Sequence, residues 1–251
     1  MRDFSYQLHS SRKFGPLPDT LRMLAGLGYR QVEGDPALFA GLEDPGQLRD
    51  ALAAAGLTMP TAHVSLEMVS ARPDRVIEIA RALDMEAVFV PALPEDEQEK
   101  TAEGWAELGR VLALSGARLR EAGVAFGWHN HAFEFAETDS AETPLDLILA
   151  GSDDLALELD IAWVARAGQD PVHWLRKYAD RIVAVHVKDI APEGENAGED
   201  GWADVGDGIL DWRRILPEVE AAGARFLVME HDNPADDARF ARRSIAAASG
   251  F

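Results

Sequence analysis

Three polar residues stand at the ends of apolar stretches in the second half of the chain: Asp160 in LALELD, His186 in VAVHVKD and Glu230 in LVMEHD. Two carboxylates in one pocket would repel each other unless a cation lay between them. Two carboxylates with an imidazole form an oxygen-rich set that suits Mn²⁺, Mg²⁺, Co²⁺ or Zn²⁺. We therefore expect one divalent metal ion. The alternative is three separate structural roles, in which Asp160 caps a turn, His186 bonds a carbonyl and Glu230 pairs with an arginine.

A second polar stretch, GWHNHAFEF at 127–135, carries His129, His131 and Glu134. Imidazoles suit metal binding and also general acid–base chemistry near neutral pH. The same residues could instead form a polar strand end whose histidines happen to be close together. The stretch on its own leaves both interpretations open.

The elements that must position these residues follow a regular order, in which short β-rich runs alternate with helical patterns and no linker interrupts them. This order predicts an α/β fold, a single-domain (β/α)₈ TIM barrel over 1–251. The expected strands are 4–8, 29–33, 57–64, 87–90, 124–129, 155–160, 182–187 and 226–230. The expected helices are 18–28, 45–55, 73–83, 100–122, 144–150, 171–178 and 211–222.

Reactive groups of such barrels come from the C-terminal ends of the strands. Because residues two apart share one face of a strand, Ala184, His186 and Lys188 should lie together, as should Glu158 and Asp160. Asp160, His186 and Glu230 should therefore converge from three neighbouring strands. His9, Glu33 and His63, at or near the ends of the first three strands, are expected to contact substrate.

Composition narrows the function further. The chain has no cysteine, so thiolate metal sites are excluded. Its 44 acidic and 24 basic residues give a net charge of −20, with no basic stripe, so nucleic acid is not an expected partner. No apolar run reaches the length of a membrane span, and we expect a soluble, cytoplasmic protein.

At the motifs quoted above, together with FSYQLHS, GYRQVE and VGDGILDW in that order, the chain resembles the sugar phosphate isomerase/epimerase superfamily with its xylose isomerase-like barrel. The resemblance implies one divalent metal held by Glu, Asp, His and Glu from strands five to eight. The last three correspond to Asp160, His186 and Glu230. Strand five departs from the pattern because it ends in His129; Glu134 is our candidate for the missing ligand, and His129 is the alternative.

The resemblance also implies isomerisation, epimerisation or dehydration of a keto-sugar or cyclitol through an enediolate, in a chain that could form a homo-oligomer. Glu230, His129 or His131 would move the proton, and Lys188 would stabilise oxyanion charge. Trp163 and Trp202 could stack on a sugar face. The acidic loop PEGENAGEDGWADVGDG argues against a phosphorylated substrate. Two alternatives are a non-catalytic binding or partner subunit and, with less support, a relative of DNA-repair nucleases.

Overall fold

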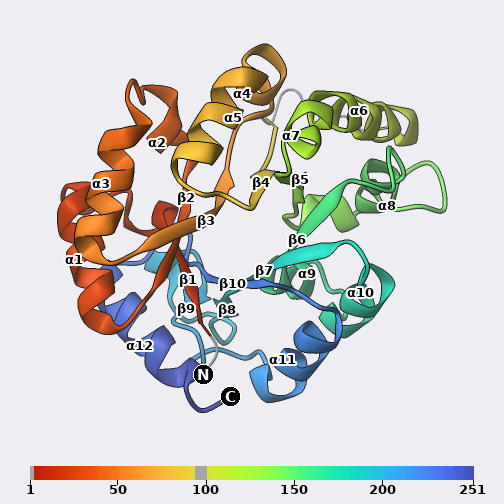
Figure 1. The fold of residues 1–251 in the computed structure, drawn as a ribbon. Coiled ribbons are helices and arrows are strands. Elements are labelled where there is room, and N and C mark those ends of the chain that lie inside the picture. The colour runs from red at the N-terminus through yellow and green to blue at the C-terminus, as the bar shows by residue number, and fades with distance from the viewer. Residues whose placement is uncertain (1–2, 94–100) are drawn as a thin grey trace.

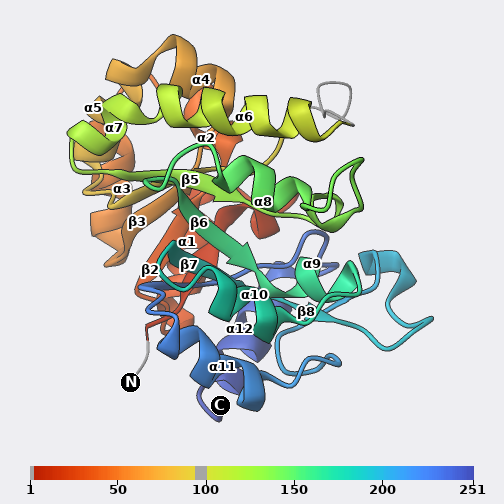
Figure 2. The ribbon, with the colours of Figure 1, turned by 90° about the vertical axis from the view of Figure 1, so that its right-hand side faces the viewer.

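The computed structural model describes residues 3–93 and 101–251. Among these residues, eight parallel strands close into a barrel in the order β1-β10-β7-β6-β5-β4-β3-β2. Figure 1 looks along this barrel and shows the helices forming a ring around it. Figure 2, turned by 90°, shows helix α6 beside α8 on the outside of the barrel. The expected (β/α)₈ fold is confirmed.

The barrel strands have bounds close to those expected: β1 (Ser5–Gln7), β2 (Gln31–Gly34), β3 (Thr58–His63), β4 (Ala87–Val90), β5 (Ala125–His129), β6 (Ala156–Asp160), β7 (Ile182–Val187) and β10 (Phe226–Met229). The helices are α1 (Leu17–Leu27), α2 (Pro36–Ala40), α3 (Pro45–Ala55), α4 (Leu66–Ala71), α5 (Pro73–Ala82), α6 (Ala102–Ser115), α7 (Ala117–Glu121), α8 (Pro144–Leu149), α9 (Ile161–Arg166), α10 (Pro171–Lys177), α11 (Trp212–Ala221) and α12 (Asp237–Ala248). None of these helices is both long and apolar enough to cross a membrane.

The helix expected at 100–122 is two helices, α6 and α7, which meet at Gly116. A Cβ at Gly116 would lie 1.9 Å from the Phe126 ring, so only glycine allows this junction to pack against β5. The expected start at residue 100 lies outside the described residues. The short helices α2, α4 and α9 and the last helix, α12, were not expected from the sequence.

The barrel interior has an apolar lower layer and, toward the C-terminal ends of the strands, a polar upper layer. Small and aromatic side chains fill the lower layer: Ala87, Phe89, Ala156, Ala184, Phe226 and Val228. Two residues beyond Ala156 in β6 stands Glu158, and two residues beyond Ala184 in β7 stands His186; both are buried, as is His63 at the end of β3. The alternation expected for β6 and β7 thus directs apolar residues toward the helices and polar residues into the upper barrel.

The loop between β7 and α11 was expected only as an acidic connection, but it is an ordered structure. It contains a small antiparallel sheet of β8 (Asp189–Ile190) and β9 (Trp202–Ala203). The buried Asp189 carboxylate accepts backbone N–H bonds from Ile190, Gly206 and Leu210. These bonds fold the loop back on itself and hold Trp202 beside the mouth of the barrel.

Candidate metal centre and active site

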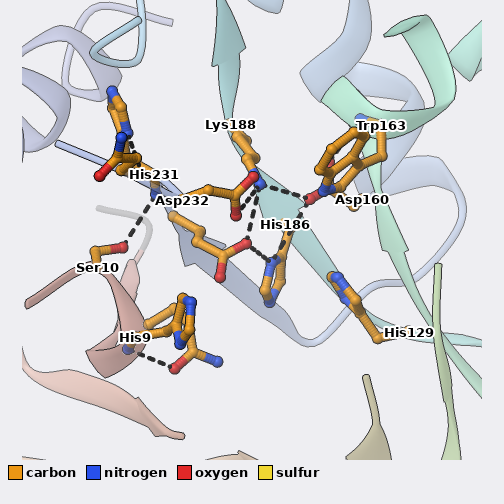
Figure 3. Close-up of polar contacts among 12 residues, drawn as sticks. His9, Ser10, His129, Asp160, Trp163, His186, Lys188, His231 and Asp232 are labelled. Atoms are coloured by element: carbon orange, nitrogen blue, oxygen red, sulfur yellow. Dashed lines mark hydrogen bonds and ion pairs between the residues drawn. The ribbon is translucent and has the colours of Figure 1, made fainter. Parts of the chain in front are cut away.

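The ends of β6, β7 and β10 place Asp160, His186 and Glu230 side by side, and Figure 3 shows the first two with Lys188. His186 Nδ1 lies 3.0 Å from Glu230 Oε2 and 3.9 Å from Asp160 Oδ2. The strand register explains this arrangement, because His186 pairs with Asp160 on one side and with Val228 on the other. The three residues therefore converge, as the strand pattern predicted.

His129, at the end of β5, completes a group of four. One ligand atom each from His129, Asp160, His186 and Glu230 lies within 4.8 Å of the others. Strand β5 approaches β6 closely because residue 127 is glycine: a Cβ there would lie 1.7 Å from the Ala156 carbonyl oxygen. The same pairing sets His129 opposite Glu158. Burial, with a smaller effect from His186, lowers the pKa of His129 well below its usual range, so its imidazole is neutral, as metal binding requires.

Glu134 belongs to neither of the candidate metal groups found among the described residues. It lies in the 3₁₀ turn η3 (Phe133–Phe135), which folds back beside β5. Its Oε1 accepts a 2.9 Å hydrogen bond from Trp128 Nε1, and its Oε2 accepts a 2.8 Å bond from the His131 backbone N–H. Both carboxylate oxygens therefore accept hydrogen bonds that stabilise the turn. This geometry gives no support to Glu134 as the strand-five ligand and favours the alternative, His129.

The Asp160 carboxylate shows that the four-residue group fits a cation. Its Oδ1 caps helix α9 by accepting the Trp163 backbone N–H at 2.9 Å, whereas its buried Oδ2 has no hydrogen-bond partner. The Lys188 ammonium lies 3.6 Å from this oxygen, beyond hydrogen-bond distance, and a cation bound closer would satisfy it. Burial raises the pKa of Asp160 to about 6. Two imidazoles and two carboxylates form a donor set suited to a borderline divalent metal.

Lys188, on the same face of β7 as His186, is fully buried among acids and aromatic rings. Its Nζ lies 2.6 Å from Asp232 Oδ1, 3.3 Å from Glu230 Oε2 and 4.2 Å from the centre of the Trp202 ring. Burial disfavours the ammonium charge, but these acids outweigh burial and raise the pKa of Lys188. The ion pair with Lys188 also changes the pKa of Glu230. Burial favours neutral Glu230, but Lys188 and His186 hold the pKa of Glu230 well below its usual range.

A cavity of about 370 Å³ opens above this group at the mouth of the barrel. Polar residues form much of its lining: His9, Asp35, His63, His129, His131, Glu230 and Asp232. Pro36, Pro91 and Ala92 add an apolar wall. Burial lowers the pKa of His131 to about 3, and its buried Nδ1 has no hydrogen-bond partner. His131 thus offers the cavity a neutral imidazole.

Residues 21–248 match the sequence profile of the xylose isomerase-like TIM barrel. The chain belongs to this family. An inosose dehydratase of Lacticaseibacillus casei is 27% identical over 141 residues, which cover 51% of the chain and 47% of that relative. The chain spans about half the length of the first curated relatives that it matches.

Solved structures share the whole fold at low sequence identity. A sugar phosphate isomerase/epimerase of Parabacteroides distasonis superposes with a TM-score of 0.80 at 19% identity and covers 98% of this chain and 94% of its own. The IolI protein, whose structure holds a zinc atom, superposes with a TM-score of 0.75 at 14% identity and covers 99% of this chain and 97% of its own.

Of the five residues expected to contact substrate, His9 and His63 line the cavity, whereas Glu33, Trp163 and Trp202 do not. His9 lines the cavity, but its Nδ1 is tied to Asp35 at 2.5 Å. Trp202 is buried, with Arg166 stacked 3.3 Å from its ring centre and Lys188 also against it, so its face is not free for a sugar. Trp163 packs edge-on against Trp202.

Glu33 is also not at the cavity. It is fully buried beneath the metal group, where Oε1 accepts from Gln7 Nε2 at 2.7 Å and lies 2.8 Å from His186 Nε2. His63 both lines the cavity and contacts this buried layer, since its Nε2 lies 3.3 Å from Glu33 Oε1.

Two acids at the site, Glu158 and Asp232, had no role assigned to them from the sequence. Glu158 lies in the buried layer with Glu33, and Asp232 holds Lys188 at the cavity wall. The alternation that placed Glu158 on one face with Asp160 was the signal for the first. Asp232 follows its strand in an irregular loop, where alternation gives no guidance.

Proposed function

We propose that the chain is a divalent-metal-dependent enzyme that isomerises, epimerises or dehydrates a keto-sugar or cyclitol. The observation that carries this proposal is the position of Asp160 Oδ2, which accepts no hydrogen bond and lies 3.6 Å from Lys188 Nζ, within reach of His129, His186 and Glu230, below a cavity that is open to substrate. These four residues would hold the metal. A bound divalent ion would polarise the substrate carbonyl and acidify the adjacent C–H.

Glu230 is the residue best placed to move the substrate proton. It lines the cavity, and the low pKa that Lys188 and His186 give it, against the effect of burial, keeps it ionised near neutral pH. Lys188 does not line the cavity; its ammonium touches Glu230 and Asp232, so we assign it the positioning of these two acids rather than direct contact with an oxyanion. The neutral imidazole of His131 would hydrogen-bond a substrate hydroxyl.

The cavity supports a neutral polyol as substrate. Its volume lies in the usual range for small-molecule sites. Among the described residues, Arg12 is the only lysine or arginine that lines the cavity. Its guanidinium already donates a 2.9 Å hydrogen bond to the His9 carbonyl oxygen. A phosphate would need several convergent donors. The name of the inosose dehydratase points to the same substrate class.

Hydrogen exchange tests this function without knowledge of the final product. The metal-loaded protein would be incubated in D₂O with inososes and ketohexoses, and the C–H signal beside the carbonyl would be followed by NMR. We expect exchange that stops on chelation and falls roughly 10²–10⁴-fold in Glu230→Gln. Glu137→Gln, an exposed acid in the loop before α8, is the matched control and should exchange at the wild-type rate. Exchange that is unchanged by chelation, or absent from every substrate with metal bound, would contradict the proposal.

A further inference from the structure

The Glu158 carboxylate stands at the centre of three histidines beneath the proposed metal group. Its Oε2 lies 2.5 Å from His63 Nε2, 3.1 Å from His129 Nδ1 and 3.3 Å from His186 Nε2. Glu158, His129 and His186 are almost completely buried. A single carboxylate oxygen therefore faces one ring nitrogen of each of the two histidines in the group of four.

The two histidines present different nitrogens to Glu158. His129 uses Nδ1 and His186 uses Nε2. The opposite nitrogen of His186, Nδ1, is the one that lies 3.0 Å from Glu230 Oε2 on the side of the proposed metal group. A neutral imidazole carries one N–H, and the nitrogen without it binds the metal, so the partner of the N–H decides which nitrogen is free.

We propose that Glu158 is a positioning residue that fixes the two ligand histidines in opposite tautomers. His129 keeps its proton on Nδ1 and offers Nε2, whereas His186 keeps its proton on Nε2 and offers Nδ1. This inference rests on the proposed metal centre. Glu33 also favours a proton on His186 Nε2, because Glu33 Oε1 lies 2.8 Å from this nitrogen and is held by a hydrogen bond from Gln7.

An alternative is that Glu158 itself binds metal, because His63, His129, Glu158 and His186 also form a group within 4.8 Å. The contact between Glu158 and His63, at 2.5 Å, is a hydrogen-bond distance. Two ligands on a tetrahedral ion with bonds of about 2.0–2.1 Å would stand roughly 3.3 Å apart. The contact between Glu158 and His63 is therefore too short for two ligands of one ion, although Glu158 Oε1, like Asp160 Oδ2, accepts no hydrogen bond. The outer group, in which His186 Nδ1 and Glu230 Oε2 lie 3.0 Å apart, is closer to the spacing of two ligands.

Zinc titration against a chromophoric chelator tests the role of Glu158 without any substrate. Glu158→Gln preserves the shape of the side chain but removes the charge that both N–H groups face, and we expect zinc affinity to fall about 10- to 100-fold. Glu199→Gln is the control, a buried carboxylate outside both groups, and should retain wild-type affinity. Circular dichroism would confirm that both variants are folded. Unchanged affinity in Glu158→Gln would overturn this inference and leave the metal centre standing.

The tautomers themselves can be read in the wild-type protein, so the test does not depend on the folding of a variant. With ¹⁵N-labelled histidine and bound Zn²⁺, long-range ¹H–¹⁵N spectra distinguish the metal-bound nitrogen from the protonated one. We expect Nε2 to bind in His129 and Nδ1 in His186. Binding through the same nitrogen in both, or two zinc ions per chain with one lost in Glu158→Gln, would overturn the inference. A wild-type protein that binds no zinc would overturn the proposed metal centre as well.

Discussion

The carboxylate of Glu134 accepts the indole N–H of Trp128 at 2.9 Å, and among the described residues it lies outside both candidate groups of metal-binding side chains. Trp128 itself is buried in the main apolar core, on the opposite face of β5 from His129. The strand-five ligand of a bound metal would therefore be either His129, directly after Trp128, or Glu134, six residues after it.

The first prediction separates these residues. His129→Ala should lose at least about tenfold in metal affinity, because it removes a ligand nitrogen of the group of four. Glu134→Gln should keep that affinity but lower the stability of the fold, since an amide N–H₂ would face either Trp128 Nε1 or the His131 N–H. Isothermal titration with Zn²⁺ and thermal unfolding measure the two effects. Loss of metal by Glu134→Gln alone would restore Glu134 as the ligand.

A second prediction concerns the two functions of the Asp160 carboxylate. Asp160→Asn retains an oxygen that can cap α9 at the Trp163 N–H but removes the charge offered by Oδ2, so metal affinity should drop by roughly tenfold or more. Asp170→Asn is a matched control, because Asp170 caps α10 in the same way and is not part of a metal group. Equal affinities in the two variants would exclude Asp160 from the ligand set.

Removal of the metal should destabilise the protein. A ligand that binds only the folded state at 100 times its Kd adds about 2.7 kcal/mol to the free energy of unfolding. For a chain of this size we expect the Tm to fall by roughly 5–10 °C on chelation. Differential scanning calorimetry with and without chelator measures the shift. In Asp160→Asn the same treatment should change the Tm much less, and an equal change there would place the bound ion elsewhere.

The pair formed by Asp35 and His9 predicts a pH-dependent stability at the cavity mouth. Burial would raise the pKa of Asp35, but the hydrogen bond and charge of His9 outweigh burial and lower it. Ionised Asp35 therefore stabilises the folded state above the ordinary carboxyl pKa, and this contribution is lost as pH falls through the lowered pKa.

Asp35→Asn keeps an oxygen for the Ala37 N–H and removes only this charge. We expect it to be less stable than wild type by roughly 1 kcal/mol near neutral pH, since His9 is partly exposed. Urea unfolding as a function of pH should show the two proteins converging below about pH 4. A difference that stays constant down to acid pH would mean that the His9 ion pair does not contribute.

Regular strand geometry explains what the sequence could predict. The alternation of LALELD and VAVHVKD correctly set Asp160 and His186 on the inner face, and the eight strands closed into the expected barrel. Irregular segments explain the rest. The turn η3 reverses the chain so that Glu134 reaches Trp128, and no periodic pattern indicates such a reversal.

The position of a side chain along the barrel axis also could not be predicted from the sequence pattern. The sequence placed Glu33 at the end of the second strand but could not give its level along the barrel axis, which depends on the stagger of the strands around the closed sheet. Glu33 is fully buried, accepts a hydrogen bond from Gln7 and does not line the cavity. The ordered loop that packs Trp202 against Arg166 likewise depends on contacts between distant segments.

Anomalous diffraction from crystals of the zinc-loaded protein, collected on both sides of the zinc edge, tests the central claim most directly. The account predicts one strong anomalous peak per chain within bonding distance of His129, Asp160, His186 and Glu230. The same crystals grown from Asp160→Asn should show this peak at much lower occupancy. No peak in the barrel, or a peak bonded to Glu134 and away from Asp160, would contradict the account.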